Sequence, residues 1–341
     1  MKQKHLILLF LLAPCLLYAQ NIPNVLFLGN SYTEVNNLPQ MVSDIAQSMG
    51  ERMTFEKNTP GGCTFRQHCG NKSMTMIQEG GWDIVVLQEQ SQLPSFPQWQ
   101  VEQECFPYAQ RLVDSIYAHN PEVEPMFFMT WGHKNGDPGN ASEFPVLATY
   151  EGMDSMLCER YIYMAEAYNA SLCPVGRVWR YLHTYNPDIE LYQNDGSHPS
   201  IAGTYAAACS FYVMFFHRDP DSILFNASLD ESTAQTIRTA VKRVVFDNLS
   251  HWQRPTPQNR IDNTPATVSL KVYPNPTTSL LTIETAGLQQ LELQDLEGRT
   301  LKTYTPTRTP VSINLGNLPT GAYLLHSKTS SGYVTRTIFK Q

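Results

Sequence analysis

Short apolar runs alternate with amphipathic stretches over most of this chain, and this alternation restricts its fold more than any other feature. The clearest run, Asp-Ile-Val-Val-Leu at 83–87, is too short for a helix and is typical of a strand buried on both faces. Strand and helix in turn predict a mainly parallel five-stranded sheet in a three-layer α/β/α sandwich. The expected strands are 25–28, 53–57, 83–87, 126–130 and 171–175, and the expected helices are 39–49, 101–119, 147–169, 200–216 and 230–250.

The first 19 residues have the pattern of a signal peptide. Lys2 and Lys4 precede an apolar core at 6–17, and Ala19 is a small residue at the expected cleavage point. The core is too short to span a bilayer comfortably. We therefore expect removal of residues 1–19 and export of the rest of the chain.

Composition bounds the partners and cofactors. With 42% hydrophobic residues among 341, the chain can bury a large core and form two domains. A net charge of −7 without a basic cluster argues against nucleic acid as a partner. No cysteine or histidine spacing fits a metal site, and no cofactor is expected. The cysteines beyond the leader permit up to three disulfides or simply buried thiols, and the pairing stays open: Cys63, Cys69, Cys105, Cys158, Cys173 and Cys209.

A serine follows the first expected strand directly. The sequence Gly-Asn-Ser at 29–31 stands at the strand's carboxyl end, where α/β proteins carry catalytic groups, although a helix-capping serine would look the same. Far downstream, Asp195 and His198 lie three residues apart in a turn-rich segment before a helix. Together these residues predict a nucleophile (Ser31), a base (His198) and an orienting acid (Asp195).

These two segments resemble the first and last signature blocks of the SGNH (GDSL-type) hydrolases. Asn30 stands where that family more often carries Asp, and Thr33 replaces the second glycine of the α/β-hydrolase elbow Gly-x-Ser-x-Gly. The resemblance implies a flavodoxin-like sandwich that cleaves esters through a Ser-His-Asp triad and an acyl-enzyme intermediate.

Two further loops resemble the blocks that bind the oxyanion. The segment 58–64 is similar to the second block, which implies that the N–H groups of Gly62 and Ser31 hold the negative oxygen. The third block ends in Asn, but Leu-Gln-Glu-Gln-Ser-Gln at 87–92 has none. A glutamine amide offers the same donors on a longer arm, so we expect Gln90 first and Gln88 second in this role. The departures indicate a divergent branch of the family.

Other side chains are candidates for contact with substrate. Trp131 and His133 follow the fourth expected strand, His68 follows the second block, and Asn30 adjoins the nucleophile. A histidine in a polar loop can equally be merely solvated.

The character of the chain changes near residue 253. A polar, proline-bearing linker leads into short strand-like pieces that predict a small β-sandwich without any catalytic set of its own. The expected division is a signal peptide at 1–19, a hydrolase domain at 20–252, a linker at 253–266 and the β-sandwich at 267–341.

This last part resembles the C-terminal sorting domain of the type IX secretion system. The matching segments are 272–276, 295–298, 318–323 and 337–340. The resemblance implies the outer-membrane secretion machinery as a partner and a secreted or surface-attached enzyme. A carbohydrate-binding or fibronectin-like module is the alternative.

Three functions follow from these observations. The first is a secreted serine esterase that removes short acyl groups, acetyl in particular, from carbohydrate. The second is a lipid esterase or thioesterase of the same fold. The third is an inactive glycan-binding protein, since the Asn of the third block is missing.

Overall fold

The computed structural model describes residues 22–120, 122–254, 270–295, 299–306, 308–329 and 332–340. The expected signal peptide and the linker residues 255–266 lie outside the described residues.

A five-stranded parallel sheet forms the centre of the first region, which confirms the predicted α/β class. The strand order is β2-β1-β3-β4-β5, so β1 lies between β2 and β3. Apolar residues on both faces suit β1, β3, β4 and β5 to a covered sheet, whereas the edge strand β2 is polar and partly exposed. The strands are β1 (Asn24–Leu28), β2 (Thr54–Asn58), β3 (Ile84–Leu87), β4 (Glu124–Phe128) and β5 (Ser171–Cys173).

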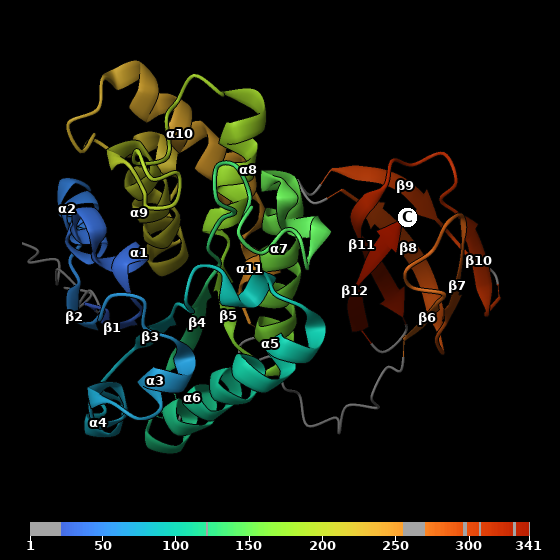
Figure 1. Cartoon of the computed structure of the whole chain (residues 1–341), viewed down its shortest axis with the longest axis horizontal. Coiled ribbons are helices and arrows are strands. Elements are labelled where there is room, and N and C mark those ends of the chain that lie inside the picture. Colours follow the sequence, from blue (N-terminus) through green and yellow to red (C-terminus); the bar gives the residue numbers. More distant parts are fainter. Residues whose placement is uncertain are drawn as a thin grey trace, which may run out of the picture.

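Helices cover both faces of this sheet (Figure 1). One layer holds α2 (Leu38–Ser48), α8 (Val175–Tyr185), α9 (Ile201–Phe216) and α10 (Glu231–Val244). The other holds α3 (Phe65–His68), α4 (Lys72–Glu79), α5 (Gln98–Glu104), α6 (Phe106–His119) and α7 (Tyr150–Ala167). The short helices α1 (Ser31–Glu34) and α11 (Leu249–Trp252) stand at the start and the end of the region.

Some helices differ from the prediction. The helix expected at 101–119 is two helices that meet at Cys105, because Pro107 has no N–H to continue the hydrogen-bond ladder across the junction. α8 was not predicted, although its apolar residues Val175, Val178 and Leu182 have helical spacing. The helix expected at 230–250 ends earlier, at Val244.

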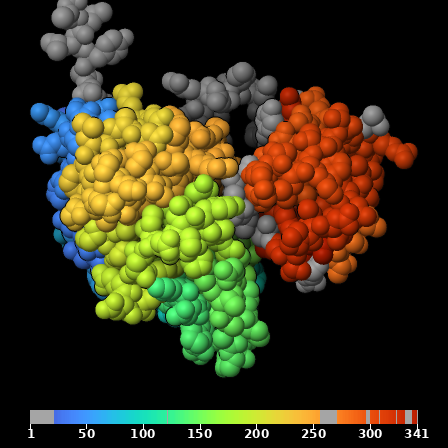
Figure 2. Space-filling view, turned by 90° about the horizontal axis from the view of Figure 1, so that it is seen from above, coloured from blue at the N-terminus to red at the C-terminus, as the bar shows by residue number. Residues whose placement is uncertain are grey.

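The second region is all β, as predicted, and Figure 2 shows its residues in orange to red. Its two antiparallel sheets have the orders β10-β7-β6 and β12-β11-β8-β9. Leu281, Ile283, Leu291, Leu293 and Ile313 form the centre of its own apolar core. The strands are β6 (Lys271–Tyr273), β7 (Leu280–Glu284), β8 (Leu288–Gln294), β9 (Thr300–Tyr304), β10 (Val311–Asn314), β11 (Gly321–Thr329) and β12 (Gly332–Lys340).

All six cysteines of the described residues are buried free thiols, so none of the permitted disulfides is present among them. Burial raises the pKa of each thiol, for example that of Cys63 to about 11, and this keeps the sulfur protonated and unreactive at neutral pH. Within the described ranges, no helix combines the length and the apolar character that crossing a membrane requires.

Candidate active site

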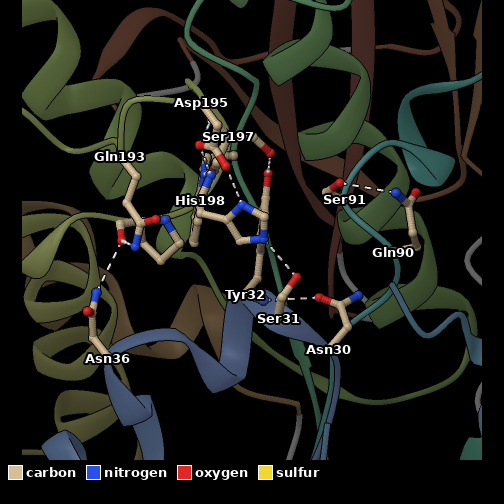
Figure 3. Close-up of polar contacts among 12 residues, drawn as sticks. Asn30, Ser31, Tyr32, Asn36, Gln90, Ser91, Gln193, Asp195, Ser197 and His198 are labelled. Atoms are coloured by element: carbon tan, nitrogen blue, oxygen red, sulfur yellow. Dashed lines mark hydrogen bonds and ion pairs between the residues drawn. The ribbon is translucent and has the colours of Figure 1, made fainter. Parts of the chain in front are cut away.

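The side chains of Ser31, His198 and Asp195 form one chain of hydrogen bonds (Figure 3). The Oγ of Ser31 is 2.9 Å from Nε2 of His198, and Nδ1 of the same ring is 2.5 Å from Oδ2 of Asp195. An ionised carboxylate only accepts hydrogen bonds, so Asp195 keeps the ring proton on Nδ1. Nε2 is then free to accept the proton of the Ser31 hydroxyl, as nucleophilic catalysis by serine requires.

Local structure brings the two halves of this arrangement to one edge of the sheet. Ser31 begins α1 immediately beyond β1, and Asn30 caps that helix by accepting the N–H of Tyr32 at 3.1 Å. His198 belongs to the loop before α9, which is closed by a hydrogen bond of 2.8 Å from the N–H of Gln193 to the His198 carbonyl. The backbone of Ser31 is therefore fixed between β1 and α1, and that of His198 by its closed loop and by α9.

Asp195 is held as an anion. Its Oδ1 accepts the N–H groups of Ser197 and His198, each at 2.9 Å. Partial burial acts to raise its pKa, but the hydrogen bonds from the His198 ring and from these two N–H groups outweigh it and lower the pKa to about 2. The side chains of Asp195 and His198 are 47% and 32% exposed, so the pair lies open to a large substrate.

Asn30 is a buried connector rather than a group that meets substrate. Its side-chain oxygen accepts from Tyr32 N–H and from the Gln88 amide, at 3.1 and 2.9 Å. Its amide nitrogen donates to the carbonyls of Cys63 and Glu89, at 3.0 and 3.4 Å. One side chain thus ties the first block to the loops of the second and third blocks.

Gln88 is also fully buried, and its amide has no hydrogen left to donate. Its Oε1 accepts the N–H of Asn30 and the hydroxyl of Thr33, each at 3.0 Å. Its Nε2 donates to Asn30 Oδ1 and to the Glu89 carbonyl. This geometry speaks against Gln88 as an oxyanion donor, because the role would break a buried hydrogen bond.

Gln90 is half-buried, and its side chain folds back on its own loop. Its Oε1 accepts the N–H groups of Gln92 and Leu93, at 2.9 and 3.0 Å. Its Nε2 donates to Ser91 Oγ at 3.2 Å and to Gln92 Oε1 at 3.4 Å, which are long contacts. The amide must turn away from these partners to reach an oxyanion at Ser31, so its predicted role stays a prediction.

Two backbone N–H groups next to the nucleophile are unoccupied. Among the described residues, neither the N–H of Ser31 nor that of Gly62 has a hydrogen-bond partner. Gly62 is exposed with φ +66°, and no atom lies within 4 Å of the place where a Cβ would stand. The Cys63 carbonyl, next along the chain, is bound to Asn30 at 3.0 Å, which keeps this loop beside the first block. A ligand can therefore approach the N–H of Gly62 without steric hindrance, and the shared oxyanion role of Ser31 and Gly62 stays a prediction.

A buried carboxyl group, Glu89, links the second and third blocks. Both of its oxygens accept the N–H of Phe65, at 3.0 and 3.1 Å, and Oε1 also accepts the N–H of Gln90 at 2.6 Å. Glu89 is completely buried, and this burial raises its pKa to about 8 even though the N–H donors act to lower it. The loops of Gly62 and Gln90 are thus attached to the same side chain.

Three of the four side chains expected to touch substrate are inaccessible, which corrects that expectation. Asn30, His68 and Trp131 are at most 2% exposed. The ring nitrogens of His68 bind Ser73 Oγ at 2.7 Å and the Gly29 carbonyl at 3.0 Å, so this residue supports the backbone before the nucleophile. Burial lowers its pKa to about 4, which keeps the ring neutral.

His133 is the remaining candidate for substrate contact, and it is half-buried. It adjoins the loop of Asp195, because the N–H of the next residue, Lys134, donates to the Gly196 carbonyl at 2.8 Å. Its Nε2 has no hydrogen-bond partner among the described groups, and burial lowers its pKa. Its contact with substrate stays a prediction.

Sequence reasoning did not find Tyr32, Glu89 and Ser197, which the structure places in direct contact with the site. Glu89 had a signal, since a charged residue two positions after a buried strand needs partners there if it is buried. Tyr32 and Ser197 adjoin the predicted nucleophile and base along the chain, but their contact spans 165 positions and no local pattern reveals it.

The comparisons with known proteins agree with both regions. Residues 271–341 match the family model "Secretion system C-terminal sorting domain", which indicates export through the outer membrane by the type IX system. No curated protein sequence matches the chain.

The α/β region has the fold of a DUF4886 family protein from Bacteroides uniformis, with 16% identity, a TM-score of 0.57, and 70% of this chain and 99% of that chain covered. A family 3 carbohydrate esterase from Clostridium thermocellum is similar at 13% identity, TM-score 0.39, with 56% and 94% covered. Phospholipase A1 from Streptomyces albidoflavus is similar at 13% identity, TM-score 0.39, with 54% and 95% covered.

Proposed function

We propose that this chain is a secreted serine esterase that hydrolyses O-acetyl esters on carbohydrate. The observation that carries the proposal is the continuous hydrogen-bonded set from Ser31 Oγ through His198 to Asp195, with distances of 2.9 and 2.5 Å. Each group has the partner that its chemical role needs. The sorting domain supports a substrate outside the cell.

In the first step, Ser31 Oγ attacks the ester carbonyl while its proton passes to Nε2 of His198. Asp195 stabilises the imidazolium through Nδ1. The N–H groups of Ser31 and Gly62 hold the oxyanion, with the Gln90 amide as the third donor after it turns. His198 then gives its proton to the leaving alcohol, and a water molecule repeats the sequence on the acyl-enzyme to release acetate.

The exposure of the site supports a bulky alcohol and a small acyl group. The side chains of Asp195 and His198 are 47% and 32% exposed, so a polysaccharide can lie across them without entering the protein. A long acyl chain needs apolar walls that enclose it. An acetyl group does not, and the oxyanion donors are almost sufficient to bind it.

The alternative is a glycan-binding protein without turnover, and the engaged amides of the third block favour it. Gln88 has no free donor, and Gln90 is turned toward Ser91 and Gln92. Losing one oxyanion donor costs about 100- to 1000-fold in rate, which slows an esterase without abolishing it.

The decisive experiment is acetate release from acetylated xylan and from p-nitrophenyl acetate by the exported chain and by Ser31→Ala. We expect a loss of at least about 1000-fold in kcat with an unchanged melting temperature, because the nucleophile is removed while the fold is kept. Butyryl and longer esters, run in parallel, distinguish an acetylesterase from a lipid esterase.

Ser48→Ala is the matched control. Ser48 ends α2 just before β2, at the opposite edge of the sheet, and its hydroxyl binds only the Ile45 carbonyl at 2.7 Å. The esterase activity of the Ser48→Ala variant should equal that of the wild type. Equal turnover by Ser31→Ala and the wild type would exclude Ser31 as nucleophile, and a folded wild type inert toward every ester would favour the binding protein.

A further inference from the structure

Several hydrogen bonds connect the segment of the predicted nucleophile with that of the predicted base, and one of them joins the residues directly next to the two reacting side chains. Tyr32 follows Ser31 in the chain, and Ser197 precedes His198. The hydroxyl groups of Tyr32 and Ser197 share a hydrogen bond of 2.7 Å (Figure 3). Ser31 and His198 themselves are joined by the 2.9 Å hydrogen bond. The two neighbouring pairs, Ser31–Tyr32 and Ser197–His198, are therefore connected at both of their residues.

A stack of aromatic rings holds the Tyr32 end of this connection. The ring of Tyr32 lies parallel to that of Trp131, with centroids 4.6 Å apart and planes 3° apart, and Trp131 stacks on Trp179 at 3.8 Å and 6°. Tyr32 is 2% exposed and the two tryptophans are fully buried. Rings packed in this way have little freedom to move, so the Tyr32 hydroxyl has a fixed position.

The same stack also holds the backbone of Ser197. The indole N–H of Trp131 donates to the Ser197 carbonyl at 3.1 Å. Ser197 is thus held through its side chain by Tyr32 and through its main chain by Trp131, immediately before His198. The rings of Tyr32 and His198 also meet edge to face, with centroids 5.6 Å apart.

The base needs such support because its loop is otherwise exposed. Asp195 is the partner that orients the His198 ring, and its own side chain is 47% exposed. Hydrogen bonds within the loop fix its shape, but its distance from Ser31 depends on contacts with the rest of the protein. A displacement of about 1 Å between reacting groups costs on the order of 100-fold in rate.

We propose that Tyr32 is a positioning residue that, through Ser197, sets the distance between Ser31 Oγ and His198 Nε2. The inference rests on the proposed esterase function and adds the residue that aligns its nucleophile and base. Tyr32 takes no part in the bond changes. Burial holds the pKa of its phenol well above the usual value, so the hydroxyl keeps its proton at every working pH.

The test is a double-mutant cycle of Tyr32→Phe, Ser197→Ala and the combined variant. Phenylalanine keeps the stacked ring and removes only the hydroxyl. We expect each single variant to lower kcat for p-nitrophenyl acetate by about 10- to 100-fold with KM little changed, because the alignment and not the binding is lost. The double variant should be no slower than the slower single one, since all three lack the same bond.

Tyr205→Phe is the matched control. It also removes a buried tyrosine hydroxyl, which donates to the Phe225 carbonyl at 2.8 Å and has no contact with the triad. It should lower the melting temperature and leave kcat unchanged. If Tyr32→Phe also lowered the melting temperature and left kcat unchanged, Tyr32 would have a purely structural role and the proposal would be overturned. Additive effects of Tyr32→Phe and Ser197→Ala on kcat would overturn it as well.

A second measurement does not depend on turnover. The N–H groups of Ser197 and His198 are bound to Asp195, and their hydrogen exchange reports how often the loop opens. Exchange at these two positions should rise at least about 10-fold in Tyr32→Phe and stay unchanged in Tyr205→Phe. If the wild type hydrolyses no ester, only the esterase proposal is refuted. The hydrogen exchange of Ser197 and His198 then tests whether Tyr32 positions the loop. Unchanged exchange would refute the positioning role.

Discussion

Glu89 is the residue on which the proposed oxyanion loops depend most. Its carboxyl group accepts the N–H of Phe65, three positions after Gly62, and the N–H of Gln90. A backbone donor is useful in catalysis only when its position is fixed before substrate arrives. The cost is a fully buried ionisable group, whose pKa burial raises to about 8.

This raised pKa predicts how stability depends on pH. Below the ordinary pKa of 4.5, Glu89 is protonated in both the folded and the unfolded chain. As pH rises toward 8, only the unfolded chain ionises freely, so the stability that this group contributes falls through that window. The free energy of unfolding from urea titrations at pH 5, 6, 7 and 8 should therefore fall less steeply for Glu89→Gln than for the wild type. Parallel pH profiles would show that Glu89 does not titrate in this range.

The residues of the proposed triad could be predicted from short segments of the sequence, and the buried residues that support them could not. Ser31, Asp195 and His198 stand in short segments whose local pattern carries their chemistry. Asn30 and Trp131 were expected to meet substrate, but both are buried, because the partners that enclose them come from distant segments. Local sequence indicates which side of the sheet a residue occupies, but it does not indicate what packs above it.

Among the elements, α9 does most to fix the loop of the base. Its N-cap is Ser200, only two residues after His198, and the Ser200 hydroxyl accepts the N–H of Gly203 at 3.1 Å. Almost all of its residues are buried, so it has no polar face from which a helical period could be read. Its existence was predicted from its length and apolar character alone, while α8 was missed although its apolar residues Val175, Val178 and Leu182 have helical spacing.

Gly203 lets α9 approach its neighbours, and Gly203→Ala tests this contact. An added Cβ would lie 2.3 Å from the Leu191 carbonyl oxygen and 2.5 Å from the Trp179 ring. We expect a loss of at least about 1–3 kcal/mol in the free energy of unfolding, because backbone and stacked ring cannot both yield. Gly70→Ala is the control, since its Cβ would lie 3.8 Å from the nearest atom. Equal thermal stability of the two variants would show that α9 shifts without cost.

At the scale of the whole molecule, the change of composition near residue 253 was sufficient to predict a second fold class. All seven strand-like segments of the last region are strands, because alternating apolar residues between turns leave few other structures open. The state of the cysteines could not be predicted, since an even count fits disulfides and buried thiols equally. Which outcome holds depends on tertiary packing, and the six cysteines among the described residues are all free thiols.

A truncated chain that ends at Arg254 should keep the esterase activity of the α/β region without the sorting domain. Arg254 anchors the end of the α/β region, since its N–H donates to Ser171 Oγ at 3.0 Å and its guanidinium to Tyr117 and to the Val123 carbonyl, at 2.7 and 2.9 Å. We expect the truncated protein to keep kcat/KM for p-nitrophenyl acetate within about twofold, because the proposed site lies wholly within the retained region.

The same truncation should abolish export, because it removes the sorting domain. Enzyme in the medium and on the cell surface, measured by immunoblot, would decrease to background. Full-length Ser31→Ala is the complementary control, which should be exported normally and be inactive. Undiminished export of the truncated chain would mean that the sorting signal lies elsewhere.

The hydrogen bonds of Asn30 make the unusual first and third blocks dependent on each other. Its amide donates to the carbonyls of Cys63 and Glu89 while its oxygen accepts from Gln88. The aspartate that SGNH hydrolases more often carry here would turn a negative oxygen toward those two carbonyls, with no proton between them. The side chain of Asn30 and the Gln-Glu-Gln segment therefore satisfy each other's hydrogen-bond donors and acceptors. A substitution of Asn30 by aspartate therefore requires a second change among the groups that contact it, because the carbonyls of Cys63 and Glu89 would otherwise lose their donor.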